Sequence, residues 1–133
     1  MLSDMKKKTL SQPTAAELEI LRVLWLRGPC TVRDVHNVLG KVKQTGYTTV
    51  LKLMQIMAEK GLVRRNEDQR AHLYEARVPQ EQTQRQLVGD LVDRAFGGSA
   101  LNLVMQALSA TKASAEDLAE IRKLLDEYER GIQ

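Results

Sequence analysis

The sequence predicts a mainly α-helical protein that carries one small β-hairpin and continues into a second, wholly helical region. Apolar residues recur at helical spacing in three segments between residues 14 and 60. The pattern then changes to the alternation typical of paired strands over residues 62–78, and helical spacing returns after Pro79. Three helices followed by a hairpin predict a winged helix-turn-helix, and the later helices predict an attached dimerisation domain.

Length and composition limit the class of protein. The 133 residues suffice for one domain, or for one small domain plus an extension, and 43% hydrophobic content can bury a core. A single cysteine excludes a disulfide framework, and two histidines argue against a dedicated metal site. The start of the chain lacks the apolar segment of a signal peptide, and no apolar run approaches the roughly 20 residues of a membrane helix. We therefore expect a cytoplasmic protein with no cofactor and no membrane insertion.

The charge is unevenly distributed. Residues 1–78 carry 14 Lys and Arg against 8 Asp and Glu, whereas residues 79–133 carry 6 against 9. A basic first half suits a polyanionic partner, and an acidic second half suits a protein partner.

The first two helices are marked by their capping residues. After a polar, Lys-rich tail over residues 1–12, which we expect to be flexible, Thr14 and Glu17 predict a capping box. Thr31 and Asp34 predict a second one. The apolar side of the first helix is expected to consist of Leu18, Leu21, Leu24 and Trp25, and that of the second of Val32, Val35, Val38 and Leu39.

The third helix and the hairpin complete the predicted DNA-binding domain, residues 13–78. The helix begins near Tyr47 and ends at Gly61, which suits a left-handed position. Its buried stripe is expected to be Val50, Leu53, Met54 and Met57. Residues 62–65 predict one strand, residues 66–69 a turn, and residues 71–78 a second strand, with Tyr74, Ala76 and Val78 on one face.

Residues 79–133 predict a helical dimerisation domain. Three short amphipathic helices, the last capped by Ser114, cannot cover their apolar stripes with one another, so a second copy of the chain is the economical cover. The residues expected to dimerise are Leu87, Leu91, Phe96, Leu101, Val104, Leu108, Leu118, Ile121, Leu125 and Tyr128.

The third helix has a polar side that suits base recognition. In a helix-turn-helix the second helix of the motif enters the major groove, where Thr, Lys and Gln side chains can read bases. The expected DNA-binding residues are Tyr47, Thr48, Thr49, Lys52 and Gln55 on this helix, Arg64, Arg65 and Arg70 on the wing, and Arg33 and Lys43 before it. The alternative is that each of these side chains is simply solvated, and that the winged helix is a protein-interaction scaffold.

Catalytic signals are weak. The chain has no nucleophile elbow, zinc-protease, P-loop or dinucleotide-binding motif, and Asp90 and Asp93 fit a solvated helix face. Cys30 is expected to be a small buried residue, with a redox role as the alternative because helix N-termini lower thiol pKa values. We expect no enzyme.

The segments PTAAELEILRVLW, GYTTVLKLMQIMAEKGLVRR and RAHLYEARV resemble, in order and spacing, the penicillinase-repressor (BlaI/MecI/CopY) family of bacterial transcription regulators. The resemblance covers about residues 13–130. It implies a homodimer on an inverted-repeat operator with TACA/TGTA-like half-sites, and repression of antibiotic-resistance or metal-homeostasis genes. It also implies that Thr48 and Thr49 contact bases and the DNA backbone and that Arg70 is the wing arginine.

The sequence departs from the family pattern at informative places. Lys52 stands where family members often have a small hydroxyl residue, and Ile56 where they often have a basic one, which puts the operator sequence in doubt. The cysteine cluster of the copper-responsive branch is absent. In the β-lactam branch, cleavage between Asn and Phe inactivates the repressor, and here Asn102-Leu103 occupies a similar place. A membrane sensor-protease is a partner that this resemblance allows.

Overall fold

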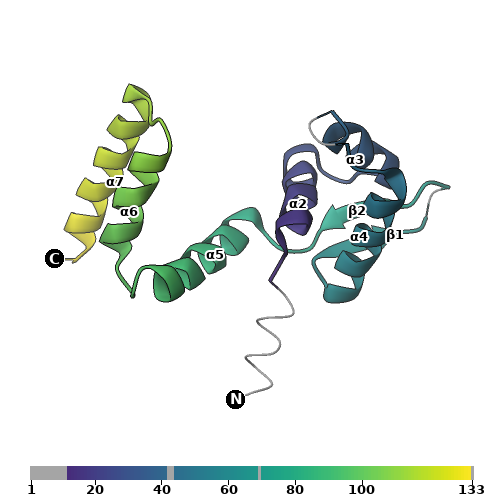
Figure 1. The fold of residues 1–133 in the computed structure, drawn as a ribbon, viewed down its shortest axis with the longest axis horizontal. Helices are drawn as coiled ribbons and strands as arrows, with labels where there is room; N and C mark the ends of the chain where they lie inside the picture. The colour runs from purple at the N-terminus through teal and green to yellow at the C-terminus, as the bar shows by residue number, and fades with distance from the viewer. Residues whose placement is uncertain (1–11, 42–43, 69, 133) are drawn as a thin grey trace, which may run out of the picture. The chain divides into compact units, whose positions relative to one another are not determined.

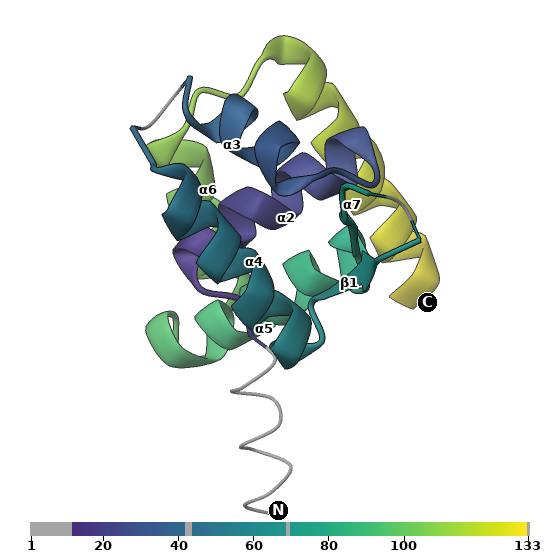
Figure 2. The same ribbon diagram turned by 90° about the vertical axis from the view of Figure 1, so that its right-hand side faces the viewer.

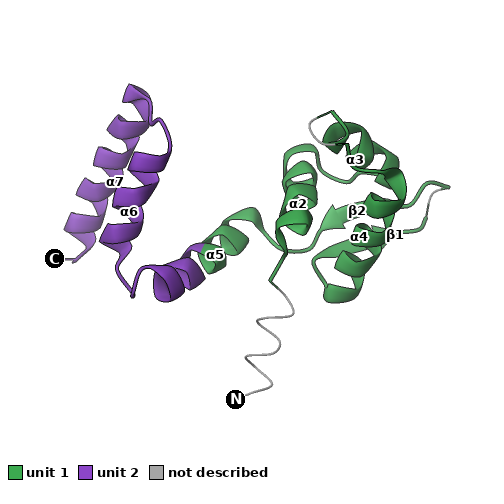
Figure 3. Ribbon diagram, in the orientation of Figure 1, with its two compact units in different colours: residues 1–87 green, residues 88–133 purple. Residues whose placement is uncertain are grey.

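The structure, a computed structural model, describes residues 12–41, 44–68 and 70–132. These residues form helices and one antiparallel hairpin, which confirms the predicted fold class (Figure 1). The chain divides into two compact units, residues 1–87 and 88–133 (Figure 3), and each is described by itself. The predicted tail, apart from Gln12, and Lys43 lie outside the described residues.

The first two helices begin at the predicted capping boxes. Helix α2 spans Ala15–Arg27: the Thr14 hydroxyl accepts the Glu17 N–H at 3.2 Å, and the Glu17 carboxylate accepts the Thr14 N–H at 2.9 Å. Helix α3 spans Val32–Leu39, and Thr31 and Asp34 form the same reciprocal pair at 3.0 Å in both directions. Each box satisfies N–H groups that would otherwise lack a partner at the helix start.

Helix α4 spans Tyr47–Lys60 and ends as predicted at Gly61, whose φ of 82° is left-handed. The N-cap is Gly46, which has no side chain to accept a hydrogen bond from the first turn. Unlike α2 and α3, α4 therefore begins without a side-chain cap.

The hairpin consists of β1 (Val63–Asn66) and β2 (Leu73–Ala76), with Arg64 opposite Glu75 and Arg65 opposite Tyr74. A further link was not predicted: Cys30 and Tyr74 exchange backbone hydrogen bonds of 2.9 and 2.8 Å. Strand β1 begins one residue later than the predicted strand at residues 62–65. Leu62 precedes the strand and is a buried core residue.

Helix α2 is the central element of unit 1, because α3, α4 and β2 all pack against it (Figures 1 and 2). Packing on several sides explains why Ile20 and Val23 are buried although they lie outside the predicted stripe, whereas Leu18 and Trp25 are half-buried. The Trp25 indole N–H donates to the Val78 carbonyl at 2.9 Å. The buried apolar residues of this core are Ile20, Leu21, Val23, Leu24, Cys30, Val32, Val35, Val50, Met54, Met57, Leu62, Val63 and Tyr74.

One buried ion pair joins the start of α2 to the end of α4. The Lys60 ammonium lies 2.7 Å from the Glu17 carboxylate, and only 3% of the Glu17 side chain is exposed. The same carboxylate oxygen accepts the Thr14 N–H. Glu17 therefore caps one helix and fixes the C-terminal end of another.

Three further helices follow: α5 (Gln80–Ala95), α6 (Ala100–Ala110) and α7 (Ala115–Ile132). Ser114 caps α7, as predicted, and it forms reciprocal hydrogen bonds with Asp117. Neither α6 nor α7 contains a buried residue. The division between the units falls within α5, and the domain boundary at Pro79 remains a prediction. Across the described residues, no helix combines the length and apolarity that crossing a membrane requires.

Replacing Lys60 tests the ion pair. Lys60→Met keeps the side-chain stem but leaves the Glu17 carboxylate buried without its cation, so we expect a loss of about 1–3 kcal/mol in the free energy of unfolding. The matched control is Lys52→Met, an exposed lysine on the same helix, for which we expect a change within about 0.5 kcal/mol. Urea unfolding followed by Trp25 fluorescence measures both, and equal losses would contradict this account of Glu17.

Candidate nucleic-acid interface

Helix α4 has one face in the core and one in solvent. Val50, Met54 and Met57 are completely buried. Thr48, Lys52 and Gln55 follow one another at the i, i+4 and i+7 spacing of a single helix face, and all three side chains are exposed. Thr49 is exposed beside them. The predicted recognition residues therefore lie together on a surface that the core does not need.

The start of α4 adds a second feature to this face. Because Gly46 supplies no side-chain cap, the first-turn N–H groups, Thr48 and Thr49 among them, are available to an acceptor outside the helix. The positive end of the helix dipole lies at the same place. Both properties favour a phosphate oxygen.

Helix α3 supplies neighbours to Tyr47. The Arg33 guanidinium lies 5.8 Å from the centre of the Tyr47 ring, and the His36 ring meets Tyr47 edge-on at 5.8 Å. The structure thus brings together Arg33 and Tyr47, which were predicted separately. It adds His36, which the sequence indicated only as a partly packed residue. The Arg33 contact places a cation over the ring of an exposed tyrosine.

The wing arginines are not equivalent. Arg64 forms an ion pair with Glu75, its partner across the hairpin, and Arg65 forms one with Glu67. Hydrogen bonds to Tyr74 and then to Glu67 raise the pKa of Arg65. The exposed Arg70 has no ion-pair partner within the described ranges. Of these three arginines, Arg70 is therefore the most available to an outside anion.

Most of the predicted dimerisation residues are exposed, and all of them except Leu87 belong to the second unit. In the single chain Leu101 is 68% exposed and Tyr128 is 70% exposed, while Leu87, Phe96, Leu118 and Ile121 are half-buried. The other exposed members are Leu91, Val104, Leu108 and Leu125. Val88, Met105 and Leu124, which belong to the same apolar stripes, are exposed as well, and so is Ile132, which the sequence did not indicate.

The remaining predicted residues have ordinary surroundings. Asn102 and Leu103 lie in the first turn of α6, where the Asn102 N–H donates to the Ser99 hydroxyl at 3.1 Å. Burial and then Asp34 raise the pKa of the Cys30 thiol, although Arg27 lowers it, and a raised thiol pKa disfavours the reactive thiolate. Across the described part of the chain, no group of three or more His, Cys, Asp or Glu residues could hold a metal ion.

Comparisons with known proteins give a consistent result. The family model described as penicillinase repressor matches residues 13–127. The penicillinase repressor of Bacillus licheniformis is 21% identical over 91% of this chain and 94% of its own length, and the transcriptional regulator BlaI of Mycobacterium tuberculosis is 29% identical over 86% and 83%. A solved structure of a MarR mutant from E. coli in complex with operator DNA is 19% identical, with a TM-score of 0.50 over 96% of this chain and 88% of that one, and shares the fold.

The wing arginines can be distinguished by salt dependence. We expect Arg70→Gln to lower the slope of log affinity against log salt by about 1 on any DNA duplex, as the loss of one phosphate contact does. Arg64→Gln should change the slope by less than half as much, because Glu75 already neutralises this arginine. The companion variant Glu75→Gln releases Arg64 and should tighten binding. A larger effect of Arg64→Gln than of Arg70→Gln, measured by fluorescence anisotropy, would contradict this assignment.

Proposed function

The chain belongs to the penicillinase repressor family, and from this premise we propose that it represses transcription as a homodimer bound to an inverted-repeat operator. Members of this family are transcriptional regulators and not enzymes, and the chain is a DNA-binding regulator of this kind. The homodimer, the operator and the residues that read it are the proposed part. Its place of action would be the cytoplasm, where the operator lies.

The proposal rests on one observation, the arrangement of α4. Thr48, Thr49 and Lys52 are exposed, whereas the apolar stripe of the same helix is buried, and the helix begins without a side-chain cap. Thr48 and Thr49 would enter the major groove first, with Lys52 and Gln55 one and two turns further along. Tyr47 and Arg33 would contact the flanking phosphates, as would Arg70 from the wing. Lys43, which belongs to the same prediction, lies outside the described residues.

A scaffold without DNA binding explains less of this surface. It would need neither exposed hydroxyls, a lysine and a glutamine on one helix face nor an exposed wing Arg70 that lacks an ion-pair partner among the described residues. A scaffold also does not explain the net charge of +6 in residues 1–78, whereas a polyanionic partner does. Equal, weak binding to every DNA sequence would favour the scaffold.

The exposed stripes of α6 and α7 support the homodimer. A single chain rarely leaves large apolar side chains such as Leu101, Leu125 and Tyr128 in water along neighbouring helices. A second copy would cover them and place two α4 helices about 34 Å apart, one turn of B-DNA. Two half-site contacts would then act as one tight site that excludes RNA polymerase.

Cleavage between Asn102 and Leu103 is the induction step that the family resemblance implies, with a membrane sensor-protease as partner and antibiotic-resistance genes as targets. The bond lies in the capped first turn of α6, so a protease would have to unwind this turn first. A cut there would remove part of the proposed dimer surface. Intact-mass spectrometry should find two fragments in induced cells, and an uncut chain would exclude this route.

Lys52→Ala tests base reading directly. We expect the variant to lose about 1–3 kcal/mol of binding free energy on a TACA/TGTA inverted-repeat duplex. Its affinity for a scrambled duplex should change little. Fluorescence anisotropy at several salt concentrations measures both affinities. The control is Glu59→Ala, an exposed position on the same helix beyond the proposed contacts. An equal loss on both duplexes would make Lys52 a phosphate contact and remove it from base reading.

Leu125→Asp tests the dimer. The side chain is 57% exposed in the single chain, so the variant should still fold, but a carboxylate at a buried dimer interface should shift the population to monomers. We expect at least a tenfold weaker dimer by analytical ultracentrifugation, with weaker operator binding. Lys123→Asp changes a charge on the same helix without removing apolar surface. A dimer unaffected by Leu125→Asp would place the interface elsewhere.

A further inference from the structure

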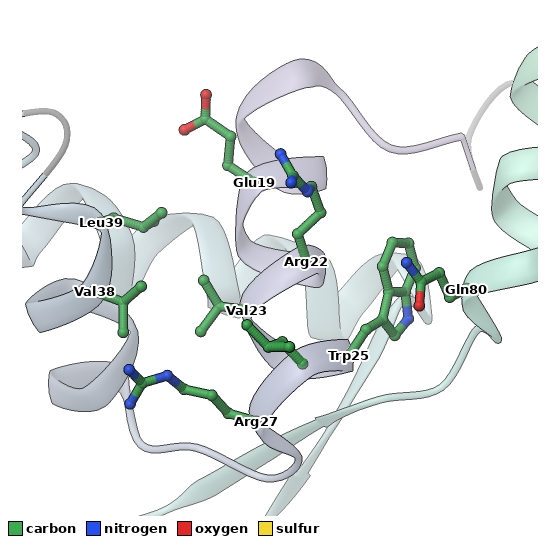
Figure 4. Close-up of a pocket in the computed structure, with 9 residues that line it drawn as sticks. Glu19, Arg22, Val23, Trp25, Arg27, Val38, Leu39 and Gln80 are labelled. Carbon is green, nitrogen blue, oxygen red and sulfur yellow. The ribbon is translucent and has the colours of Figure 1, made fainter. Parts of the chain in front are cut away.

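Unit 1 contains an open cavity of about 550 Å³ on the outer surface of α2, and none of the predicted DNA-binding residues that the structure describes lines it. Its volume falls within the range of about 300–1,000 Å³ that is typical of small-molecule sites. Figure 4 shows Val38 and Leu39 projecting from α3 on one side of α2 and Trp25 on the other. No residue of α4, all of which the structure describes, belongs to the lining, so the cavity is separate from the outward face of α4.

The lining of the cavity combines aliphatic side chains with one aromatic ring that a hydrogen bond holds in place. Val23, Leu26, Val38 and Leu39 provide aliphatic surface, and Leu26 is 85% exposed, which is costly for a leucine without a covering group. The Trp25 ring is held by the hydrogen bond from its indole N–H to the Val78 carbonyl. A rigid aromatic wall beside aliphatic side chains suits a flat apolar body.

The rim is positively charged. Arg22 and Arg27 line the cavity and are exposed, and no ion pair or hydrogen bond to either side chain is present among the described residues. Among the described lining residues, Glu19 is the one carboxylate, and it already takes part in an interaction. Gln80, the first residue of α5, adds an amide that can donate a hydrogen bond. The charge left uncompensated in this lining is cationic.

We propose that this cavity binds a small amphipathic anion, with an aromatic or aliphatic body on Trp25 and Leu26 and a carboxylate or sulfonate at the cationic rim that Arg22 and Arg27 provide. Shape and burial supply the affinity for the apolar body, and the two arginines select the anion over a neutral molecule of the same shape. The site does not depend on the proposed repressor activity, because its residues and those of the outward α4 face do not overlap. Ligand binding and DNA binding can therefore each fail alone.

Trp25 makes the test specific, because it is the only tryptophan of the chain. Its indole N–H gives one signal in a nitrogen–proton NMR spectrum of the full-length protein. The probe is the dye anilinonaphthalene sulfonate, and the matched neutral probe is phenylnaphthylamine, which has the same rings without the sulfonate. Dye bound at the exposed stripes of the second unit would contribute to fluorescence but leave the indole signal unchanged.

We expect the dye to shift the indole signal with saturation and to bind more tightly than the neutral probe. Arg22→Gln and Arg27→Gln should each weaken dye binding about threefold, and the double variant about tenfold, as solvated charge contacts do. Leu26→Glu, at an exposed position, should weaken it about tenfold by adding a like charge. The control Arg85→Gln removes an exposed arginine that does not line the cavity and should change nothing.

Three results would overturn the proposal. The first is an indole signal that does not move at saturating dye. The second is a neutral probe that binds as tightly as the sulfonate. The third is a pair of arginine variants that bind the dye like the Arg85→Gln control. Because all the substituted side chains are exposed, an otherwise unchanged NMR spectrum establishes that each variant is folded.

Discussion

The outward face of α4 depends on the complete burial of its other face. Val50, Met54 and Met57 have no exposed surface, so rotating α4 about its axis would expose core and bury Thr48, Lys52 or Gln55. The ion pair from Lys60 to Glu17 holds the far end of the helix against the start of α2. Packing sets the rotation of α4, the ion pair fixes its C-terminal end, and the start is left free to meet a ligand.

The charged side chains also divide into those that hold the fold together and those that are available to a ligand. Inside unit 1, charges that serve the fold are paired, as in Glu17 with Lys60. On the wing, Arg64 and Arg65 pair with glutamates in the free protein, and exposed pairs of this kind are worth only about 0–1 kcal/mol. A phosphate could therefore replace Glu75 or Glu67 at small cost, whereas Arg70 is available at once. At the cavity on α2, Arg22 and Arg27 likewise have no ion-pair partner within the described ranges, so they too are available to an anion.

Local signals in the sequence predicted most of this fold. Two capping boxes, Gly61 and the apolar stripe of α4 were predicted correctly because each depends on residues a few positions apart. The larger misses are non-local. The Cys30–Tyr74 bridge, the Glu17–Lys60 pair and the Arg64–Glu75 pair depend on how distant segments meet, and Ile20 and Val23 are buried because α2 has several neighbours. The sequence predicted the candidate site as one face of a helix. It could not predict that Arg64 and Arg65 form ion pairs with glutamates.

In the proposed repressor, two copies of the α4 face, held by one dimer, read a two-fold symmetric operator. Selection of binding sequences from random DNA would test this proposal without assuming the half-sites that Lys52 and Ile56 put in doubt. We expect an enriched inverted repeat whose half-site centres lie about 10 base pairs apart. Enrichment of a single half-site would contradict the dimer geometry, and the absence of any enriched sequence would contradict base reading by α4.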